Sequence, residues 1–494
     1  MLDEINQLVD EFRQQRDLYE SEEVVDLEIT LKVIRSESGR DCHISNTDEV
    51  AGIMVGDTKD TCGERDIVVH DKIKGLVRVS YVHPKLMALQ YPLLFSRGED
   101  GLHPKIKFQK NDESKGLTPT LGGRLFQQYS VDAFSSIEQT RLWWFRTHQT
   151  TLRNELYSNI CDSLSRGDVD TSNIGTGIIL PAGFVGSKRY MQQNFQDALA
   201  ICHFIGHPDI FLIMTCNPLW DEIQKMMKYL PGCIAPNCPD IISRVFRLKL
   251  DQLLADIKTK KYFGVCNGVM YVVEFQKRGL PHVHMLIWLD ADLKKNLKQN
   301  VDKYVSAEIP DPLLDPVCYA TMKEFMIHGP CGLQNLKSPC MKGFNCIRHF
   351  PKKYYAQTTF DDSGFLIYIR RRQDITVDVR KTDLDNQWVV PYNRDLLVKY
   401  QCHVNVEIYC HAQSVKYLFK YCLKGHDHAT VYINKKKKQS KNNNDDRGID
   451  EINAYFDRRY LCGAEATYRI FGLPIHHRSL SVERLPFHLP GAKN

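Results

Sequence analysis

One stretch of the chain, residues 271–289, constrains the fold more than any other. Its sequence is YVVEFQKRGLPHVHMLIWL, two apolar runs joined by a polar turn that contains Gly279 and Pro281. Two β-rich runs with such a connection predict a β-hairpin. Because successive side chains of a strand alternate between its two faces, His282 and His284 should point to the same side. The hairpin would therefore present two imidazoles on one face of a sheet.

Two imidazoles on one face can share a cation. Glu274 lies on the first strand of the hairpin, and its carboxylate could complete the site with oxygen. Imidazole and carboxylate ligands with open positions suit Mg²⁺, Mn²⁺ or a transition ion that acts as a Lewis acid on a phosphate. Glu407, in a second strand-like run at residues 402–410, is an alternative third ligand. The sequence thus predicts a Mg²⁺ or Mn²⁺ site at His282 and His284.

The segments before the hairpin extend the expected sheet. Residues 210–220 form a short apolar run that ends in Asn-Pro, which predicts a buried strand. Residues 241–261 have apolar side chains at helical spacing. Strand, helix and hairpin in this order give β-α-β-β, most of a ferredoxin-like split sandwich, with the histidines on a central strand. We therefore expect an α+β fold around an antiparallel sheet.

The composition limits where the protein acts. Its 494 residues suffice for two to four compact units at roughly 150 residues each. A net charge of +5 is too small a surplus to indicate nucleic-acid binding by itself. No run reaches the roughly 18 apolar residues of a membrane span, and the N-terminus lacks the pattern of a secretion signal. Sixteen cysteines then indicate reduced thiols and a metal site, in the nucleus or the cytosol.

Changes in composition along the chain suggest its division. The expected units are an N-terminal module of unknown role at residues 1–82, a mostly helical part at 83–206, a core at 207–430 that contains a small Cys/His insertion at 328–351, a low-complexity loop at 431–449, and a C-terminal packing segment at 450–494.

The insertion has the ligands of a structural zinc site. Cys331, Cys340, Cys346 and His349 fall close together among Gly, Pro and Lys, and His328 competes as the nitrogen ligand. Structural Zn²⁺ is tetrahedral and takes such sulfur and nitrogen sets from short, turn-rich loops. Three cysteines in so short a polar loop have no core in which to be buried, which favours the metal site.

Basic and aromatic residues follow the insertion and interleave. They are Tyr354, Tyr355, Tyr368, Arg370, Arg371 and Arg372. Charges that hold phosphates and rings that stack on bases are what a groove for single-stranded DNA needs. A solvated charged face explains the three arginines equally well.

A helix expected at residues 411–424 carries Tyr417 and Tyr421, four apart and so on one face. The histidines of the hairpin lie in the sequence HVHMLI, which lacks the third histidine of a histidine-triad hydrolase. Its histidine-hydrophobe-histidine (HUH) pattern is that of enzymes that nick single-stranded DNA through a tyrosine. A phenol with a pKa near ~10 attacks a phosphate well only if that phosphate is polarised or a base takes its proton. Lys420 or Lys424 could bind the phosphate.

Several segments in order resemble the N-terminal Rep region of Helitron transposases. They are FLIMTCNPLW, YVVEFQKRGLPHVHMLIWL, SAEIPDP, FMIHGPCG, VVPYN, KYQCHVNVE and VKYLFKYCLKGHD, and the resemblance runs from about residue 83 to the C-terminus. It implies an HUH-type, ferredoxin-like (RRM-like) core, His282 and His284 as the HUH pair, and Tyr417 and Tyr421 as paired nucleophiles. The implied reaction is rolling-circle-like nicking and transfer of single-stranded DNA through a 5′-phosphotyrosyl intermediate. The Cys/His loop is similar to the zinc-binding insertion of such proteins.

One departure from that family bears on function. Helitron transposases continue into a helicase, whereas this sequence has no G-x-x-x-x-G-K-S/T phosphate loop. We therefore expect no ATPase, and unwinding would have to be supplied elsewhere. The competing interpretations are a truncated or decayed transposon-derived protein that binds DNA without cutting it and a zinc-stabilised protein-interaction module. A nuclear location is expected.

Overall fold

The computed structural model describes ten longer ranges and five short strands. The longer ranges are 83–95, 100–101, 123–152, 178–230, 234–260, 262–275, 279–362, 365–409, 450–456 and 459–483; the short strands lie at 32–33, 51–54, 67–71, 75–79 and 431–432.

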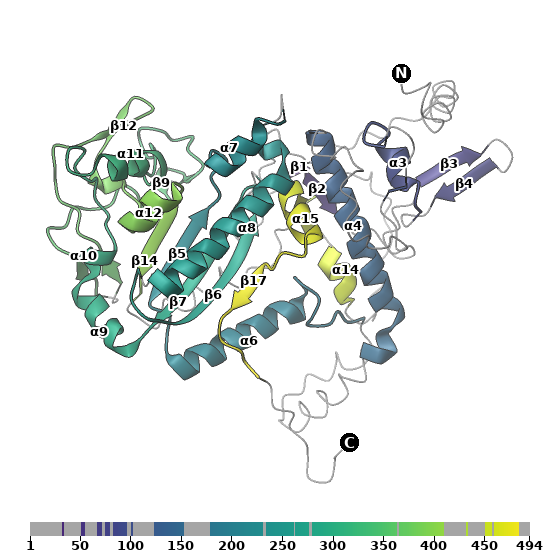
Figure 1. The fold of residues 1–494 in the computed structure, drawn as a ribbon, viewed down its shortest axis with the longest axis horizontal. Coiled ribbons are helices and arrows are strands. Elements are labelled where there is room, and N and C mark those ends of the chain that lie inside the picture. Colours follow the sequence, from purple (N-terminus) through teal and green to yellow (C-terminus); the bar gives the residue numbers. More distant parts are fainter. Residues whose placement is uncertain are drawn as a thin grey trace, which may run out of the picture.

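An antiparallel sheet, here called the main sheet, organises the described residues (Figure 1). Its strand order is β14-β5-β7-β6-β17, and each neighbouring pair is antiparallel. The strands are β5 (Ile210–Thr215), β6 (Cys266–Phe275), β7 (Pro281–Leu289), β14 (Val404–Ile408) and β17 (His476–Arg478). The strand that carries both histidines is therefore central, as predicted, and the α+β class is confirmed.

The predicted hairpin is formed by β6 and β7. Phe275 pairs with Pro281, so residues 276–280 connect the strands, and Pro281, which was predicted in the turn, is the first residue of β7. Gly279 adopts a φ of 77° that favours glycine. β7 is apolar at nearly every position because it is buried on both faces, which is typical of the middle strand of a covered sheet.

Two helices cover opposite faces of the main sheet. The predicted helix after β5 is α8 (Pro239–Ala255), and its Phe246, Leu250 and Leu253 lie in one buried cluster with Val283, Met285 and Ile287 of β7. On the other face, Ala198, Ile201 and Cys202 of α6 (Lys188–Ile205) pack against Phe211, Leu286 and Trp288. Alternation places His282 and His284 on the α6 side.

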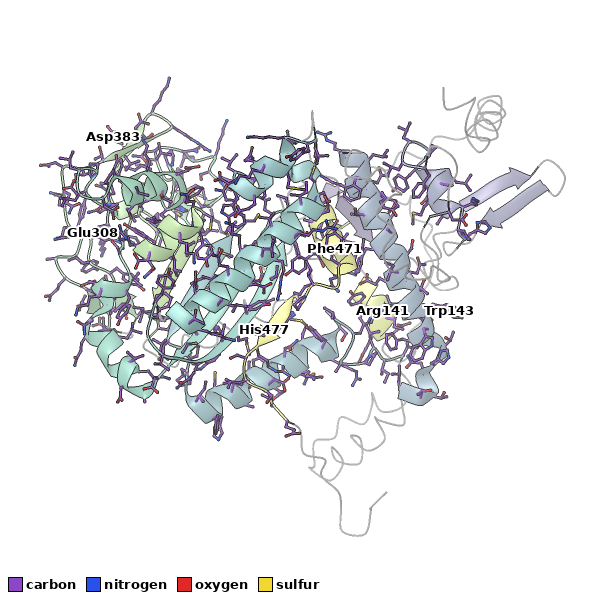
Figure 2. All side chains as sticks on the ribbon, in the orientation of Figure 1. Arg141, Trp143, Glu308, Asp383, Phe471 and His477 are labelled. Atoms are coloured by element: carbon purple, nitrogen blue, oxygen red, sulfur yellow. The ribbon has the colours of Figure 1, made fainter. Side chains whose placement is uncertain are left out.

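A long helix, α4 (Arg124–Thr147), joins the C-terminal segment to this core. It packs against α15 (Gly463–Ile470), which also packs against α8. Within this contact Glu138 of α4 pairs with Arg459, and Tyr455 donates a hydrogen bond of 2.7 Å to the same carboxylate. Figure 2 shows Trp143 on the outer side of α4, where 54% of this residue is exposed.

The chain between β7 and β14 forms a unit that we call the insertion module, residues 306–400, on the β14 side of the main sheet (Figure 1). Two buried clusters hold it together, one around Met322 and Tyr392 and one around Cys331 and Trp388. Figure 2 labels Glu308 and Asp383 in this module. Its elements are α11 (Pro316–Phe325), β8 (Met341–Lys342), β9 (Asn345–Cys346), β10 (Thr359–Phe360), β11 (Leu366–Ile367), β12 (Val377–Val379), β13 (Thr382–Leu384), the 3-10 helix Asn386–Trp388 and α12 (Arg394–Tyr400).

Shorter elements complete the described part. They are β1 (Lys32–Val33), β2 (Ala51–Met54), β3 (Ile67–Asp71), β4 (Gly75–Val79), α3 (Leu86–Gln90), α7 (Asp221–Met227), the 3-10 helix Ala235–Asn237, the π-helix Asp256–Lys260, α9 (Ala291–Gln299), α10 (Val301–Tyr304), β15 (Val431–Tyr432), α14 (Glu451–Phe456) and β16 (Arg459–Cys462). No helix in this part of the chain combines the length and the apolar character needed to cross a membrane.

Candidate functional site

The two histidines of β7 point to the same face and meet a carboxylate from β6. His282 pairs directly with Glu274 on one side and with Thr215 of β5 on the other. His284 pairs with Val272 and Ile213 in the same way. The position of the carboxylate beside the imidazoles therefore follows from the register of the hairpin.

The distances suit three ligands around one cation. Glu274 Oε2 lies 3.5 Å from His282 Nε2 and 3.7 Å from His284 Nε2. These separations are too long for good hydrogen bonds. Ligand atoms that each lie about 2.0–2.2 Å from a metal are separated from one another by roughly 3.0–3.5 Å. One atom from each of Glu274, His282 and His284 falls within 4.8 Å of the others, so the donor set fits a divalent cation.

The surroundings keep the histidine pair in place. His284 is 5% exposed, and the Phe211 ring stacks on its imidazole at 5.7 Å between centroids. The Nδ1 atom of His282 is buried without a hydrogen-bond partner among the described residues. Sequence reasoning did not identify Phe211, because an aromatic residue in an apolar strand gives no signal beyond core packing.

Glu407, the alternative third ligand, belongs to a different arrangement. It lies on β14 opposite Phe211, on the same face as the histidines but two strands away from β7. Its carboxylate accepts hydrogen bonds from Asn405 Nδ2 at 3.1 Å and from the Tyr409 hydroxyl at 3.0 Å. The close group around the histidines therefore includes Glu274 and not Glu407.

A second group of possible metal ligands lies in the insertion module. His328, Cys331, Cys340 and Cys346 each contribute one atom to a group whose members lie within 4.8 Å of one another. All three predicted cysteines are present in it. Three sulfurs and one nitrogen fit a tetrahedral ion such as Zn²⁺. Burial is the main cause that raises the pKa of Cys331 to about 12, and its hydrogen bonds with Cys340 and Cys346 add to the effect.

The nitrogen in this group comes from the alternative, His328, and not from His349. His328 Nε2 lies 3.4 Å from Cys346 Sγ, and its ring stacks on Phe350 at 4.2 Å. His349 is exposed, has a φ of 58°, and is not a member of the group. His328 precedes Cys331 by three positions and His349 follows Cys346 by three, so spacing along the chain does not separate the two candidates. The path of the chain brings His328 to the cysteines.

The predicted DNA-binding arginines have three different environments. Arg370 is 4% exposed, and its guanidinium donates hydrogen bonds to the carbonyls of Ala307 at 3.1 Å and Asn386 at 2.5 Å. Burial lowers its pKa to about 10. The prediction of a DNA contact at Arg370 is therefore corrected: this arginine holds the interior of the module, where a neighbouring strand of nucleic acid cannot reach it.

The other two arginines are exposed. Arg371 makes a bidentate ion pair with Glu308, with Nε 3.1 Å from both carboxylate oxygens, so its charge is largely compensated. Arg372 lies over the Tyr354 ring, 5.1 Å from its centroid. Tyr368 is also excluded from a stacking role, because it is buried and its hydroxyl accepts a hydrogen bond from the backbone of Ile408.

The structure does not test the expected nucleophiles or the lysines near them. Tyr417, Lys420, Tyr421 and Lys424 lie outside the described residues, so their roles stay predictions.

Comparison with known families bears on the histidine site. Residues 107–287 match the family model described as the Helitron helicase-like domain at the N-terminus. The matched segment contains Glu274, His282 and His284 and stops before the Cys/His group. A comparison with curated proteins finds no match.

Proposed function

We propose that this chain, in which residues 107–287 are a Helitron-like N-terminal region, nicks and transfers single-stranded DNA by an HUH mechanism. One observation carries the proposal: Glu274 of β6 and His282 and His284 of the central strand β7 converge on one face of the main sheet inside that region. A Helitron-related nuclease or transposase needs a site that polarises a phosphate, and this group has the ligands for it.

The order of the elements supports an HUH-type, ferredoxin-like (RRM-like) core. Along the chain the elements are β5, α8, β6, β7, α12 and β14, and in the sheet the four strands stand in the order β14-β5-β7-β6. β7 is thus inserted between the strands that flank α8, which is the split β-α-β arrangement. This order favours the proposed core over an unrelated antiparallel sheet.

In the proposed site, His282 and His284 supply nitrogen and Glu274 supplies oxygen to one Mg²⁺ or Mn²⁺ ion. Bound there, the ion would supply Lewis-acid polarisation of the scissile phosphate. Phe211 stacks on the His284 imidazole and limits its rotation. Three protein ligands would leave coordination positions for the phosphate, which is the arrangement of a catalytic rather than a structural metal site.

Tyr417 or Tyr421 would attack the phosphorus through its phenolic oxygen. A tyrosyl O–P bond forms, the bond from phosphorus to the 3′ oxygen breaks, and the proton lost by the phenol balances the one gained by the 3′-hydroxyl. The phosphodiester energy is retained in the 5′-phosphotyrosyl link, so the reverse reaction can join strands without ATP. A second tyrosine four positions away in the sequence would allow two successive transesterifications, with Lys420 or Lys424 binding the phosphate.

The test is formation of a covalent adduct. We expect the intact protein, incubated with a labelled single-stranded oligonucleotide and Mn²⁺ or Mg²⁺, to yield a protein–DNA adduct that survives denaturation. The adduct should disappear in the double variant Tyr417→Phe, Tyr421→Phe and in His282→Ala. Tyr229→Phe is a matched control, because Tyr229 is 80% exposed, follows the end of α7, and is not a member of the histidine group.

Two outcomes would overturn the nuclease. One is no adduct with the intact protein, which leaves a chain that binds DNA without cutting it. The other is an adduct that persists in the double tyrosine variant. His282→Ala should retain oligonucleotide binding, because only one metal ligand is removed.

A further inference from the structure

The loop that carries the Cys/His group is uniformly basic. We call residues 328–353 the Cys/His loop. No acidic residue occurs between positions 325 and 360, while the loop carries five cations. Four of them are exposed, namely Lys337, Lys342, Arg348 and Lys353. The fifth, Lys352, is half-buried. A whole-chain charge of +5 therefore conceals a stretch of the chain whose charged residues are all basic.

Large apolar side chains are exposed among these cations. Leu333, Leu336, Phe344 and Ile347 are 89%, 48%, 76% and 55% exposed, respectively. Phe344 lies in the turn of the β8–β9 hairpin, two positions after Lys342, and Gly343 between them has a φ of 62°. An exposed ring beside an exposed ammonium is the pair that stacks on an unpaired base and holds its phosphate.

The hairpin that presents Phe344 is fixed at its base. Met341 pairs with Cys346, a member of the Cys/His group, and Met341 Sδ accepts a hydrogen bond from the Gly332 backbone at 3.1 Å. His328, another member, is stacked on Phe350. The ring is thus held in an exposed position before any partner arrives, which lowers the entropy lost on binding.

Hydrogen bonds link the strand next to the histidine site to the segment that precedes the Cys/His loop. Thr215, which pairs with His282, donates its backbone N–H to the carbonyl of His403 at 3.0 Å. The His403 imidazole in turn contacts the Phe325 carbonyl at 2.9 Å, at the end of α11 and three residues before the loop. These two contacts connect the strand next to His282 with the segment that leads into the loop.

We propose that the Cys/His loop is a binding surface for single-stranded DNA, with Phe344 stacked on a base and Lys342 and Arg348 on neighbouring phosphates. This inference rests on the proposed function, because the strand held by the loop is the substrate of the histidine site. The lack of acidic residues favours a polyanion over a protein partner. The exposed ring favours unpaired bases over a duplex, whose bases are already stacked.

The experiment is equilibrium binding of a labelled oligonucleotide to the full chain, followed by fluorescence anisotropy over a range of salt. Phe344→Ala should weaken binding about tenfold, since a stacked base contributes about 1.4 kcal/mol. Lys342→Gln should lower the slope of log K against log salt by about 0.7, the value for one phosphate contact on a single strand. Both side chains are exposed, so circular dichroism and metal content should be unchanged.

Two variants of the same module are matched controls. Phe360→Ala removes another partly exposed ring, which precedes Asp361 and Asp362. Lys381→Gln removes one exposed cation beside the hairpin that carries Asp383. Both should bind the oligonucleotide as the unaltered chain does, because neither lies in the Cys/His loop.

The outcomes separate this inference from the nuclease. Weaker binding in Phe344→Ala supports the surface even if no covalent adduct ever forms. Unchanged binding in both Phe344→Ala and Lys342→Gln overturns the surface, even if the adduct does form, and assigns the exposed apolar residues to a protein partner. Equal losses in the control variants would also overturn it, because they would show an unspecific effect of charge or of apolar surface.

Discussion

Glu274 of β6 faces His282 of β7 directly across the strand pair, and its Oε2 lies 3.5 Å from the imidazole Nε2. The same oxygen is 3.7 Å from His284 Nε2, so one carboxylate serves both histidines. The five-residue connection sets this register. A slip by one residue would turn Glu274 to the α8 face and dismantle the group.

Glu274→Gln should reduce affinity for Mn²⁺ by about tenfold or more, because loss of even an outer-shell partner costs roughly 10–100-fold. Isothermal titration measures the effect, and adduct formation should fall with it. Glu407→Gln is the matched control, since that carboxylate accepts hydrogen bonds from Asn405 and Tyr409 instead. A larger loss in Glu407→Gln would assign the third ligand to β14.

The two candidate nitrogen ligands of the Cys/His group can be separated by metal content. His328→Ala should abolish or greatly reduce stoichiometric zinc, because the structure brings this imidazole to the three thiols. His349→Ala should keep the metal, because that side chain is exposed. Zinc is measured by elemental analysis of the purified chain. If His328→Ala retained zinc and His349→Ala lost it, the nitrogen ligand would be His349 instead.

Removal of the metal should loosen the insertion module more than the main sheet. The Cys331–Trp388 cluster lies around the Cys/His group, whereas the core between α8 and the sheet is formed by other residues. Hydrogen exchange after chelation should therefore increase in residues 328–353 and remain slow in β7. Equal acceleration in both would show that the two parts unfold as one unit.

Arg370→Gln should destabilise the fold rather than selectively weaken DNA binding. Its guanidinium serves two buried carbonyls, and each unsatisfied carbonyl costs about 1–3 kcal/mol. Urea unfolding measures the loss. Arg372→Gln, which changes an exposed residue, should leave the unfolding midpoint nearly unchanged. A stable Arg370→Gln variant with weaker oligonucleotide binding would contradict the buried role.

The contact between α4 and the C-terminal segment depends on a buried ion pair. Arg459→Ala should cost about 3–5 kcal/mol of stability, because Glu138 would keep a buried charge without its arginine. Arg394→Ala breaks an exposed pair with Asp315 and should cost less than about 1 kcal/mol. Similar unfolding midpoints for the two variants would contradict this expectation. They would show that in Arg459→Ala the Glu138 carboxylate becomes hydrated or takes up a proton.

The sequence by itself determined the local features of this protein. Alternation in the hairpin placed His282 and His284 on one face, and the order of strand, helix and hairpin gave a sheet with the histidines at its centre. The three clustered cysteines indicated a metal group. Each inference rests on the period or the spacing of residues that are close in sequence. Over such short distances the geometry of the backbone allows the side chains few arrangements.

Only the tertiary structure decided which distant residues meet. Glu274 rather than Glu407 joins the histidines, His328 rather than His349 joins the thiols, and Arg370 faces the interior of the module instead of solvent. These choices depend on strand register and on packing between segments far apart in sequence, and residue type does not encode either distance or burial. An arginine close to a tyrosine in the sequence gives the same pattern whether its guanidinium binds a buried carbonyl or a phosphate.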